Sequence, residues 1–380
     1  KESYTFKDGL KTGPFEERTA NGVLSVGGSF EKGKKDGIWE FYNFFGILEK
    51  RVGYHLDSLH GSYLVMVNEF DTLTFGHYEM GLKSGHWKWY SEAGKIDMEG
   101  HFKNGKQDSI WHYYFSSGQL SYIAHYKDDL RTNKWTYYYP NGALYRTGNY
   151  LNDLRTGIWQ TWYEDSTLLM MGRYVDGKEE GEWLNYWENG RLKDKTTFSQ
   201  GQLHGKWQSY APDGILKLQG TYKSGYKVGE WISYFNNGSI KEKQHYKVFT
   251  QKNVADGIAI MGLKETVSDF HGSYEAYSQV DFQIKETGKY YHGLKHGTWT
   301  NYYPGGLVPT IVAQYQYGRL HGVFKQYDRY GRIVYEIHYK RGLKDGPFYA
   351  FNENGQLISK KMFKQGRELG SQGQEIFSPY

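Results

Sequence analysis

A glycine that recurs at every twenty-fourth position constrains the fold of this chain more than any other feature. An aromatic residue follows each anchor at the second position. The anchors that keep this 24-residue step are Gly13, Gly37, Gly61, Gly85, Ser109, Asn133, Gly157, Gly181, Gly205 and Gly229. A fixed period of this length is typical of repeat architectures, in which each unit is stabilised by packing on its neighbours.

The period is interrupted once, after the tenth anchor. Gly229 is followed by Gly272, nineteen positions later than the period requires, so an insertion of that length separates them. The remaining anchors, Gly297, Gly322 and Gly346, return to the original spacing to within one position. We therefore predict ten repeats in residues 1–246, an insertion at 247–270, and four repeats with a C-terminal tail in 271–380.

Each repeat is predicted to be a β-hairpin. Asn-Gly pairs between β-prone segments favour tight turns, because both residues accept a positive φ. In one sample repeat we expect strands at 86–90 and 95–103, with a turn at 92–94 and a second turn at Asn104-Gly105. The predicted fold is an all-β, elongated and twisted single array of fourteen antiparallel hairpins with roughly 28 strands. Different turns are expected where the usual glycine is absent, at Phe70, Ser109, Asn133, Ser166 and Asp281.

Aromatic columns supply the predicted core. The column at the second position after the anchor consists of Phe15, Trp39, Tyr63, Trp87, Trp111, Trp135, Trp159, Trp183, Trp207, Trp231, Tyr274, Trp299, Phe324 and Phe348. These rings are expected to stack on one another as a ladder. A second column, at the fifth position after the anchor, falls on the opposite face of a regular strand. It forms either an exposed tyrosine surface, in which Tyr114, Tyr138 and Tyr186 are candidate partner-binding residues, or a second core next to a strand bend.

Composition excludes several classes of protein. The chain of 380 residues has no Cys, which excludes disulfides and thiolate metal sites, and its net charge of +5 is small for a nucleic-acid binder. No apolar run approaches the length that spans a bilayer. The first residue is Lys1, and the repeat is already recognisable at Tyr4, which we interpret as a mature or trimmed chain.

No residue set suggests catalysis, a cofactor or a metal ion. Five histidines precede anchor glycines, namely His60, His204, His271, His296 and His321. They occupy one column in different repeats, so neighbouring members are expected to lie about 10 Å apart, too far to share a metal ion. We interpret them as structural. Glu179 and Glu180 are interpreted as solvated turn charges, and the sequence contains no nucleophile or phosphate-binding motif.

The insertion is the main irregularity, and its centre is apolar. Ile258, Ile260, Met261 and Leu263 are candidate partner-binding residues, because insertions in repeat arrays fall on loops and often on the binding face. The alternative is a longer hairpin that only covers a sheet edge.

The pattern resembles the MORN repeat, in the variant form found in bacterial proteins named YwqK-type antitoxins. The clearest copy is residues 222–238, which read Tyr-Lys-Ser-Gly-Tyr-Lys-Val-Gly-Glu-Trp-Ile-Ser-Tyr-Phe-Asn-Asn-Gly. The resemblance covers nearly the whole chain. It implies an antiparallel β-array used for protein contacts or as a spacer, without chemistry of its own.

These observations predict a non-enzymatic interaction scaffold whose partner is another protein, with no nucleic acid and at most peripheral membrane contact. The residue usage resembles envelope proteins of Bacteroidota. We therefore expect a periplasmic or outer-membrane-associated subunit of a cell-envelope assembly, in one version a subunit that caps or plugs an outer-membrane protein-export channel. The alternatives are a toxin-neutralising or immunity protein, which could be cytoplasmic, and a carbohydrate-binding aromatic array.

Overall fold

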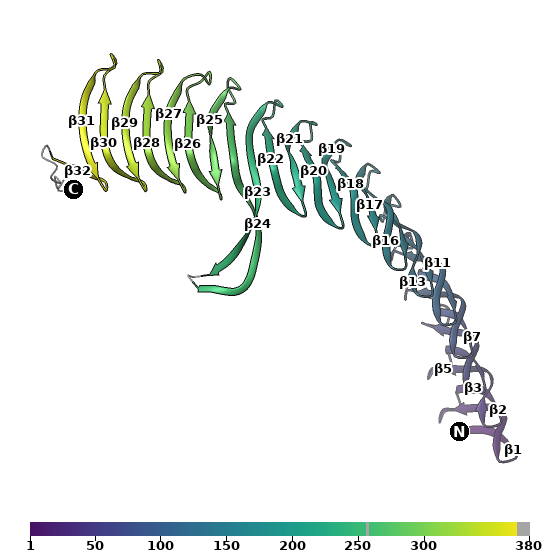
Figure 1. The fold of residues 1–380 in the computed structure, drawn as a ribbon. Coiled ribbons are helices and arrows are strands. Elements are labelled where there is room, and N and C mark those ends of the chain that lie inside the picture. The colour runs from purple at the N-terminus through teal and green to yellow at the C-terminus, as the bar shows by residue number, and fades with distance from the viewer. Residues whose placement is uncertain (256–257, 371–380) are drawn as a thin grey trace. The chain divides into compact units, whose positions relative to one another are not determined.

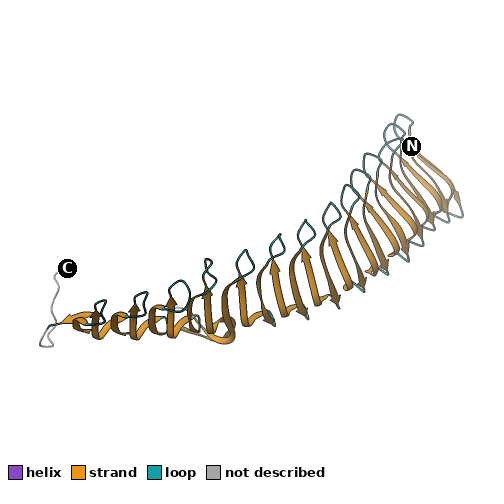
Figure 2. Ribbon diagram, turned by 90° about the horizontal axis from the view of Figure 1, so that it is seen from above, coloured by secondary structure: helices purple, strands orange, loops and turns teal. Residues whose placement is uncertain are grey.

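The computed structural model describes residues 1–255 and 258–370, with the side chains of residues 250–265 outside this description. The described residues form 32 strands of one antiparallel sheet and no helix (Figure 2). The prediction of an all-β array of antiparallel hairpins is confirmed. By internal contacts the chain divides into two compact units, Lys1–Glu180 and Gly181–Tyr380.

Strands of the first unit pair in chain order. They are β1 (Glu2–Lys7), β2 (Leu10–Arg18), β3 (Leu24–Glu31), β4 (Lys34–Lys35), β5 (Gly37–Tyr42), β6 (Leu48–His55), β7 (Ser58–Met66), β8 (Thr72–Glu79), β9 (Leu82–Tyr90), β10 (Ile96–Lys103), β11 (Lys106–Tyr114), β12 (Leu120–Lys127), β13 (Leu130–Arg131), β14 (Asn133–Tyr138), β15 (Leu144–Leu151), β16 (Leu154–Trp162) and β17 (Leu168–Val175). β18 (Lys178–Tyr186) begins in this unit and ends in the second.

The second unit follows the same scheme. Its further strands are β19 (Leu192–Ser199), β20 (Gln202–Tyr210), β21 (Leu216–Lys223), β22 (Tyr226–Tyr234), β23 (Ile240–Ala255), β24 (Ile258–Tyr277), β25 (Ile284–Tyr291), β26 (Leu294–Tyr302), β27 (Pro309–Gln316), β28 (Arg319–Tyr327), β29 (Ile333–Lys340), β30 (Leu343–Phe351), β31 (Leu357–Lys364) and β32 (Arg367–Leu369). The strands outnumber those predicted because two are divided, at Asp36 and Thr132, and because β1 and β32 flank the hairpins.

Most anchor residues lie inside a strand, although Gly37 and Asn133 begin β5 and β14. The first strand of the sample repeat was predicted to begin at His86, but β9 already begins at Leu82, and Gly85 within it has a φ of 65°. The pairing of β8 with β9 shifts register beside Gly85, so the anchor occupies a β-bulge. Glycine suits this position because it has no Cβ that would clash at positive φ. Ser109 (63°) and Asn133 (52°) adopt the same conformation, so the expectation of different turns there was wrong.

Among the hairpin turns that lack the usual glycine, one is ordinary and two differ. Ser166 has a φ of 70° and donates its N–H to the Tyr163 carbonyl at 3.0 Å, as glycine does elsewhere. At Phe70 the turn is instead held by the Asn68 side chain, whose Oδ1 accepts the Phe70 N–H at 2.8 Å. After Asp281 the positive φ falls on Phe282, at 58°. The prediction of different turns therefore holds only for the last two.

The core is a layer of indole rings that lie flat on one face of the sheet. Trp87 and Trp111 are each 1 % exposed. Six tryptophans of the column lie against a glycine on the preceding strand: a Cβ on Gly100, for example, would come within 2.5 Å of Cγ of Trp111. Trp207 instead faces Thr196. The indole N–H of Trp111 donates to the backbone carbonyl of His101 at 3.2 Å. This bond explains why tryptophan, with a ring donor, dominates the column.

Only some tryptophans stack directly on the next repeat, which corrects the predicted ladder. Trp207 and Trp231 are in contact, with ring centroids 5.6 Å apart. Between Trp87 and Trp111, however, the ring of Trp89 is inserted, at 5.6 Å from one and 5.7 Å from the other. A third ring type, at the seventeenth position after the anchor, meets the tryptophans edge-on: Phe102 lies 5.0 Å from Trp111.

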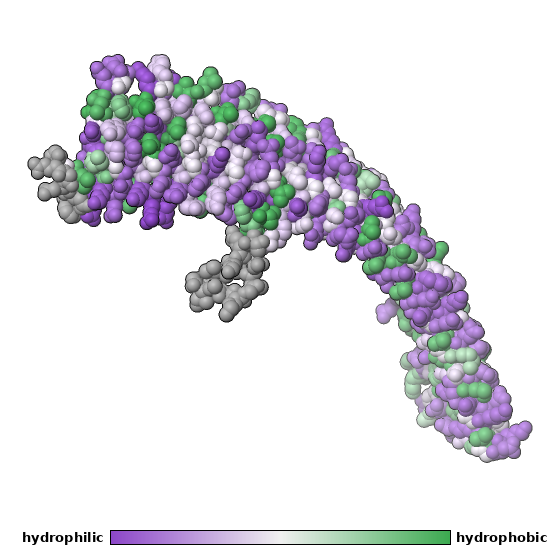
Figure 3. Space-filling model, viewed as in Figure 1, coloured by the Kyte–Doolittle hydropathy of each residue, from purple (hydrophilic) through white to green (hydrophobic). Residues whose placement is uncertain are grey.

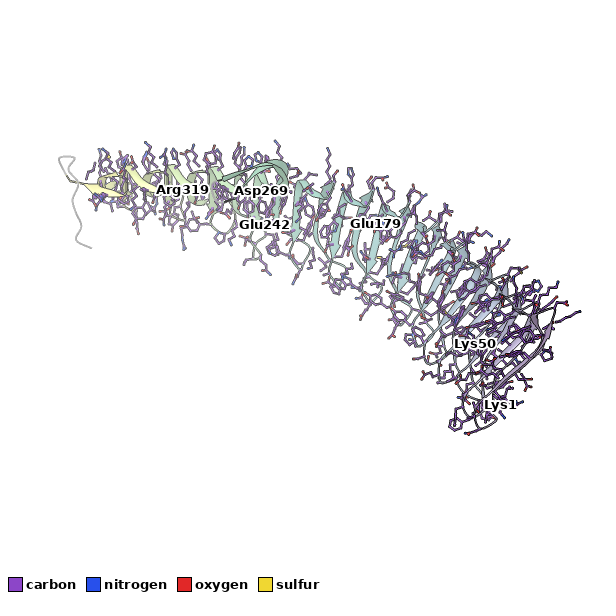
Figure 4. All side chains as sticks on the ribbon, turned by 90° about the horizontal axis from the view of Figure 1, so that it is seen from below. Lys1, Lys50, Glu179, Glu242, Asp269 and Arg319 are labelled. Carbon is purple, nitrogen blue, oxygen red and sulfur yellow. The ribbon has the colours of Figure 1, made fainter. Side chains whose placement is uncertain are left out.

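No helix or second sheet covers either face in the described residues, so side chains project from both faces (Figure 4). On the face seen in Figure 3, hydrophilic residues dominate and hydrophobic residues form separate small patches between them. Binding surfaces must therefore be sought on two open faces and two rows of turns.

Candidate interaction surfaces

The insertion forms one long hairpin, β23–β24, which projects from the row of turns (Figure 1). β23 pairs with β22 as far as Tyr246, and β24 pairs with β25 from Gly272 onward. Beyond these points, the pairings of β23 and β24 in the described residues are with each other. The backbone of 248–255 and of 258–267 therefore offers two strand edges without a sheet neighbour.

The candidate residues of the insertion lie on one arm of this hairpin. Ile258, Ile260, Met261 and Leu263 belong to β24, next to a register shift opposite Lys252 to Val254. Their side chains lie outside the part of the chain whose side chains are described. Their role in binding stays a prediction.

A cluster of aromatic and imidazole rings supports the base of the hairpin. Phe249 of β23 packs on His292, with centroids 4.0 Å apart, and on His271 at 5.0 Å. Tyr291 lies 5.0 Å from His271 and 5.9 Å from Tyr317, which is 56 % exposed. The hairpin therefore leaves the sheet through a packed junction.

Polar contacts hold the same junction. The Ser268 hydroxyl donates to the Lys227 carbonyl of β22 at 2.6 Å, and the Gly293 N–H donates to the Phe270 carbonyl at 2.9 Å. Burial lowers the pKa of His271, and the nearby Lys247 ammonium lowers it further. The neutral imidazole is thus the form that fits the junction.

The three candidate tyrosines are half-buried residues of one repeat column, on the face opposite the tryptophans. Tyr114 and Tyr138 lie in consecutive repeats of the first unit, whereas Tyr186 belongs to the second. The Tyr114 hydroxyl donates to Glu99 at 2.8 Å, and Lys88 contacts the same carboxylate at 3.1 Å.

This hydrogen-bond network changes the titration of both partners. Burial, together with the hydrogen bond to Glu99, raises the pKa of Tyr114 to about 12. Burial alone would raise the pKa of Glu99, but hydrogen bonds from Tyr114 and Lys88 lower it overall. Tyr114 therefore links neighbouring strands in addition to any role in binding.

Two histidines of the column, His60 and His321, form structural hydrogen bonds. Nδ1 of His60 accepts the N–H of Met80 at 3.4 Å, and Nδ1 of His321 accepts that of Arg341 at 3.4 Å. Each acceptor thereby caps the turn of the next hairpin, whose first residue has a positive φ. In the described residues, no group of three or more His, Asp or Glu side chains is arranged to hold a metal ion.

Two columns escaped the sequence reasoning although the period could have revealed them. The first is the small residue at the fifteenth position after the anchor (the sixteenth after Gly272), on which the next tryptophan rests. It is glycine at Gly28, Gly76, Gly100, Gly148, Gly172, Gly220 and Gly288. The second is a basic residue at the second position before the anchor, such as Lys83. Both recur with the period of the repeat, but neither is conspicuous in a single copy.

The comparison with protein families agrees with this geometry. The family described as "MORN repeat variant" matches residues 83–104, 107–128, 131–152, 179–200, 203–224, 227–247, 320–341 and 344–365. The chain carries MORN repeats of the variant type. These eight matches confirm the resemblance, while the count of fourteen copies stays a prediction. MORN repeats are a non-catalytic repeat type.

Other comparisons add little. No curated protein matches the sequence. Solved structures that match include the crystal structure of TcdB2-TccC3-TEV (10% identity, TM-score 0.16, 96% of this chain and 23% of that chain). Another is the Tc holotoxin pore of Photorhabdus luminescens with mutation TccC3-D651A (11% identity, TM-score 0.17, 94% and 23%). The chain thus spans about a quarter of the length of these chains. TM-scores this low carry no argument about fold or function. Within the described ranges, no helix has the length and apolarity to cross a bilayer.

Proposed function

We propose that this MORN-repeat chain is a non-enzymatic scaffold that docks another protein through the hairpin β23–β24. The observation that carries the proposal is the pair of strand edges, 248–255 and 258–267, that continue beyond the sheet without a sheet neighbour. Unpaired strand edges are templates for another chain, and soluble proteins usually shorten, bend or cover them. An edge of this length is consistent with a site that a partner strand covers.

The recognition mode would be strand addition. On each edge alternate residues direct both N–H and C=O outward, so about four residues per edge offer paired donors and acceptors. Main-chain bonds of this kind give affinity, and side-chain pockets give specificity. The ring cluster around Phe249 supports the proposal, because a packed base limits the freedom that the hairpin would lose on binding.

We further propose that the partner belongs to a bacterial cell-envelope assembly, with this chain as a periplasmic or outer-membrane-associated subunit. One version is a subunit that caps or plugs an outer-membrane protein-export channel. The support is the residue usage, rich in Tyr, Asn and Lys, that resembles envelope proteins of Bacteroidota. A carbohydrate-binding array is less favoured, because sugars stack on exposed ring faces and most rings of the tryptophan column are buried.

The experiment is affinity purification of the native complex with a hairpin-trimmed variant. Replacing residues 248–268 by Ser-Gly, the turn pair at Ser224-Gly225, removes the inserted length and restores the regular step from Gly229 to Gly272. The trimmed chain keeps all fourteen anchors but loses the junction contacts of Phe249 and Ser268. Cooperative urea unfolding with a small loss of stability is therefore expected, and it shows that the repeat array is still folded.

We expect the parent chain to recover a defined envelope protein and the trimmed chain to lose it. Recovery of the same partner by both chains would contradict docking through the hairpin. Recovery of a toxin by the parent chain would support the antitoxin alternative, and recovery of free monomer alone after gentle extraction would contradict the scaffold.

A further inference from the structure

A row of basic side chains caps the aromatic layer of the first unit. In the column at the second position before the anchor, residues 1–180 contain Lys11, Lys35, Lys83, Arg131 and Arg155, and two further cations on this face are Lys50 and Arg146. Lys50 is labelled in Figure 4. Ring contacts place six of these side chains on the face that carries the tryptophans. Arg146 lies on the same face because its Nε donates to the hydroxyl of Thr161, two residues after Trp159.

The cations lie directly over the rings. Nζ of Lys83 is 4.6 Å from the ring centroid of Trp87 and 5.0 Å from that of Phe102. Nζ of Lys35 is 4.5 Å from the ring of Trp39. An ammonium over an aromatic face is stabilised by the ring quadrupole, while the methylene stem covers apolar surface. This arrangement explains how tryptophans on an open sheet face remain buried.

Positive charge on this face is largely uncompensated. From Lys35 to Arg155, the columns that form the face contain no Asp or Glu. In the described residues of this stretch, the ion pair on this face joins Arg131 to the turn residue Asp153, at 2.9 Å. Lys35, Lys50 and Lys83 have no carboxylate within ion-pair distance there. Burial lowers the pKa of Lys83, as expected for an ammonium without a counter-charge.

On the opposite face, in contrast, two cations pair with carboxylates. Arg51 pairs with Glu40 at 2.7 Å, and Lys88 pairs with Glu99 at 3.1 Å. The absence of carboxylates is therefore a property of one face and not of the first unit as a whole.

We propose that this cation-capped face of residues 1–180 binds an extended acidic segment of a partner protein. Charge complementarity favours an anion, because carboxylates would supply the counter-charge that the face lacks. Ligands that need ring stacking, such as sugars or bases, are disfavoured since the cations cover the ring faces and Trp39 is only 2 % exposed. The surface is distinct from the hairpin β23–β24, so the two proposals stand independently.

The repeat spacing sets the pattern of the acidic segment. Equivalent cations in adjacent repeats are two strands apart, which is about 9.6 Å. An extended peptide advances about 3.3 Å per residue, so about three residues span one repeat. Lys11 and Lys35 are one repeat apart, and Lys35 and Lys83 are two repeats apart. The segment should therefore carry Asp or Glu at about every third or sixth position.

The test compares two double variants of the full chain. Lys35→Met/Lys83→Met removes two charges from the capped face, and the unbranched methionine side chain still covers the rings. The matched control, Lys103→Met/Lys134→Met, removes two charges from positions that alternate with Phe102 and Trp135 and so fall on the opposite face. The probe is a fluorescent oligoglutamate peptide, with binding followed by anisotropy at several salt concentrations.

The parent chain should bind the probe with an affinity that falls as salt rises, because screening weakens charge–charge contacts. The Lys35/Lys83 variant should bind about tenfold more weakly, and the control should stay within about twofold of the parent. The hairpin-trimmed chain should bind like the parent, which separates this proposal from the docking function.

Equal weakening in both double variants would show that net charge alone acts and would overturn the proposal. Absence of probe binding by the parent at low salt would overturn it as well. Anionic lipid vesicles and single-stranded DNA serve as competitors, and tighter binding of either would contradict an acidic protein segment as the ligand. Unchanged urea unfolding of the Lys35/Lys83 variant excludes loss of fold as the cause.

Discussion

The contact between Gly148 and Trp159 offers a quantitative test of how the sheet is stabilised. A Cβ added to Gly148 would lie 2.5 Å from Cγ of Trp159 and nearer still to two other ring atoms. Carbon atoms in contact are normally about 3.5–4.0 Å apart, so the ring must lift by about 1 Å or more. Lifting the ring stretches its 3.2 Å hydrogen bond to the Asn149 carbonyl and disturbs its edge contact with Tyr150.

We expect Gly148→Ala to lower the free energy of unfolding by about 2–4 kcal/mol, the sum of two effects. Overpacking contributes about 1–3 kcal/mol and the weakened hydrogen bond about 0.5–1.5 kcal/mol. Trp159→Ala should cost about 3–5 kcal/mol, because it empties a buried site.

The chain contains its own control for this prediction. Where the ring is tyrosine, at Tyr63, the residue beneath it is Val52 and not glycine. The double variant Gly148→Val/Trp159→Tyr copies that pair. Its loss of unfolding free energy should be smaller, by at least about 1 kcal/mol, than the summed losses of the single variants Gly148→Val and Trp159→Tyr, because residues in contact are coupled.

Hydrogen exchange of the β15, β16 and β17 amides measures the local free energy, with urea unfolding as the global readout. A change below about 0.5 kcal/mol for Gly148→Ala, or strict additivity in the double variant, would refute the flat-lying ring as the source of stability.

Further predictions follow from the backbone and from titrating groups. Ser109→Gly should raise the free energy of unfolding in urea by about 1 kcal/mol, because Ser109 holds a φ of 63°; a loss of stability would contradict this. The pKa of Tyr114 is raised from 10.0 to about 12. The contribution of Tyr114 to the stability of the folded chain is therefore complete below pH 10 and is lost as pH rises toward 12. Alkaline unfolding should therefore coincide with tyrosinate absorbance in this window and shift in Tyr114→Phe; an unchanged profile would contradict it. Because the pKa of His271 is lowered, its contribution to the stability of the folded chain is present above pH 6.5 and is lost as pH falls. Acidification below pH 6.5 should thus lower the hydrogen-exchange protection factors at the base of β23, and His271→Gln should abolish that dependence. Equal protection factors above and below pH 6.5 would speak against a neutral imidazole in the junction.

The fold was largely predictable because its signal is repeated in every copy. The regular spacing of the anchors and the Asn-Gly pairs were sufficient to predict antiparallel hairpins. Strand limits were less accurate, because Gly85 was interpreted as the boundary of a strand when it is a bulge inside one. A glycine at positive φ has the same sequence signature in both settings, and only the register of the neighbouring strand distinguishes them.

The candidate surfaces were predicted less completely. The insertion was recognisable as a break in the period. That it lengthens β23 and β24 into one hairpin depends on backbone pairing, which composition does not specify. The cation-capped face depends on which columns share a side of the sheet. That assignment requires the bulge at each anchor, which brings Lys83 over Trp87. The partner is not encoded in these residues, so binding has to be measured.

Hydrogen exchange of the hairpin in the purified native complex tests the central claim most directly. If another protein docks by strand addition, amides in 248–255 or 258–267 should exchange more slowly in the complex than in the free chain. Amides in the other row of turns, at the opposite ends of the strands, should exchange at the same rate in the complex and in the free chain. A stable complex in which the hairpin amides exchange as in the free chain would contradict the account.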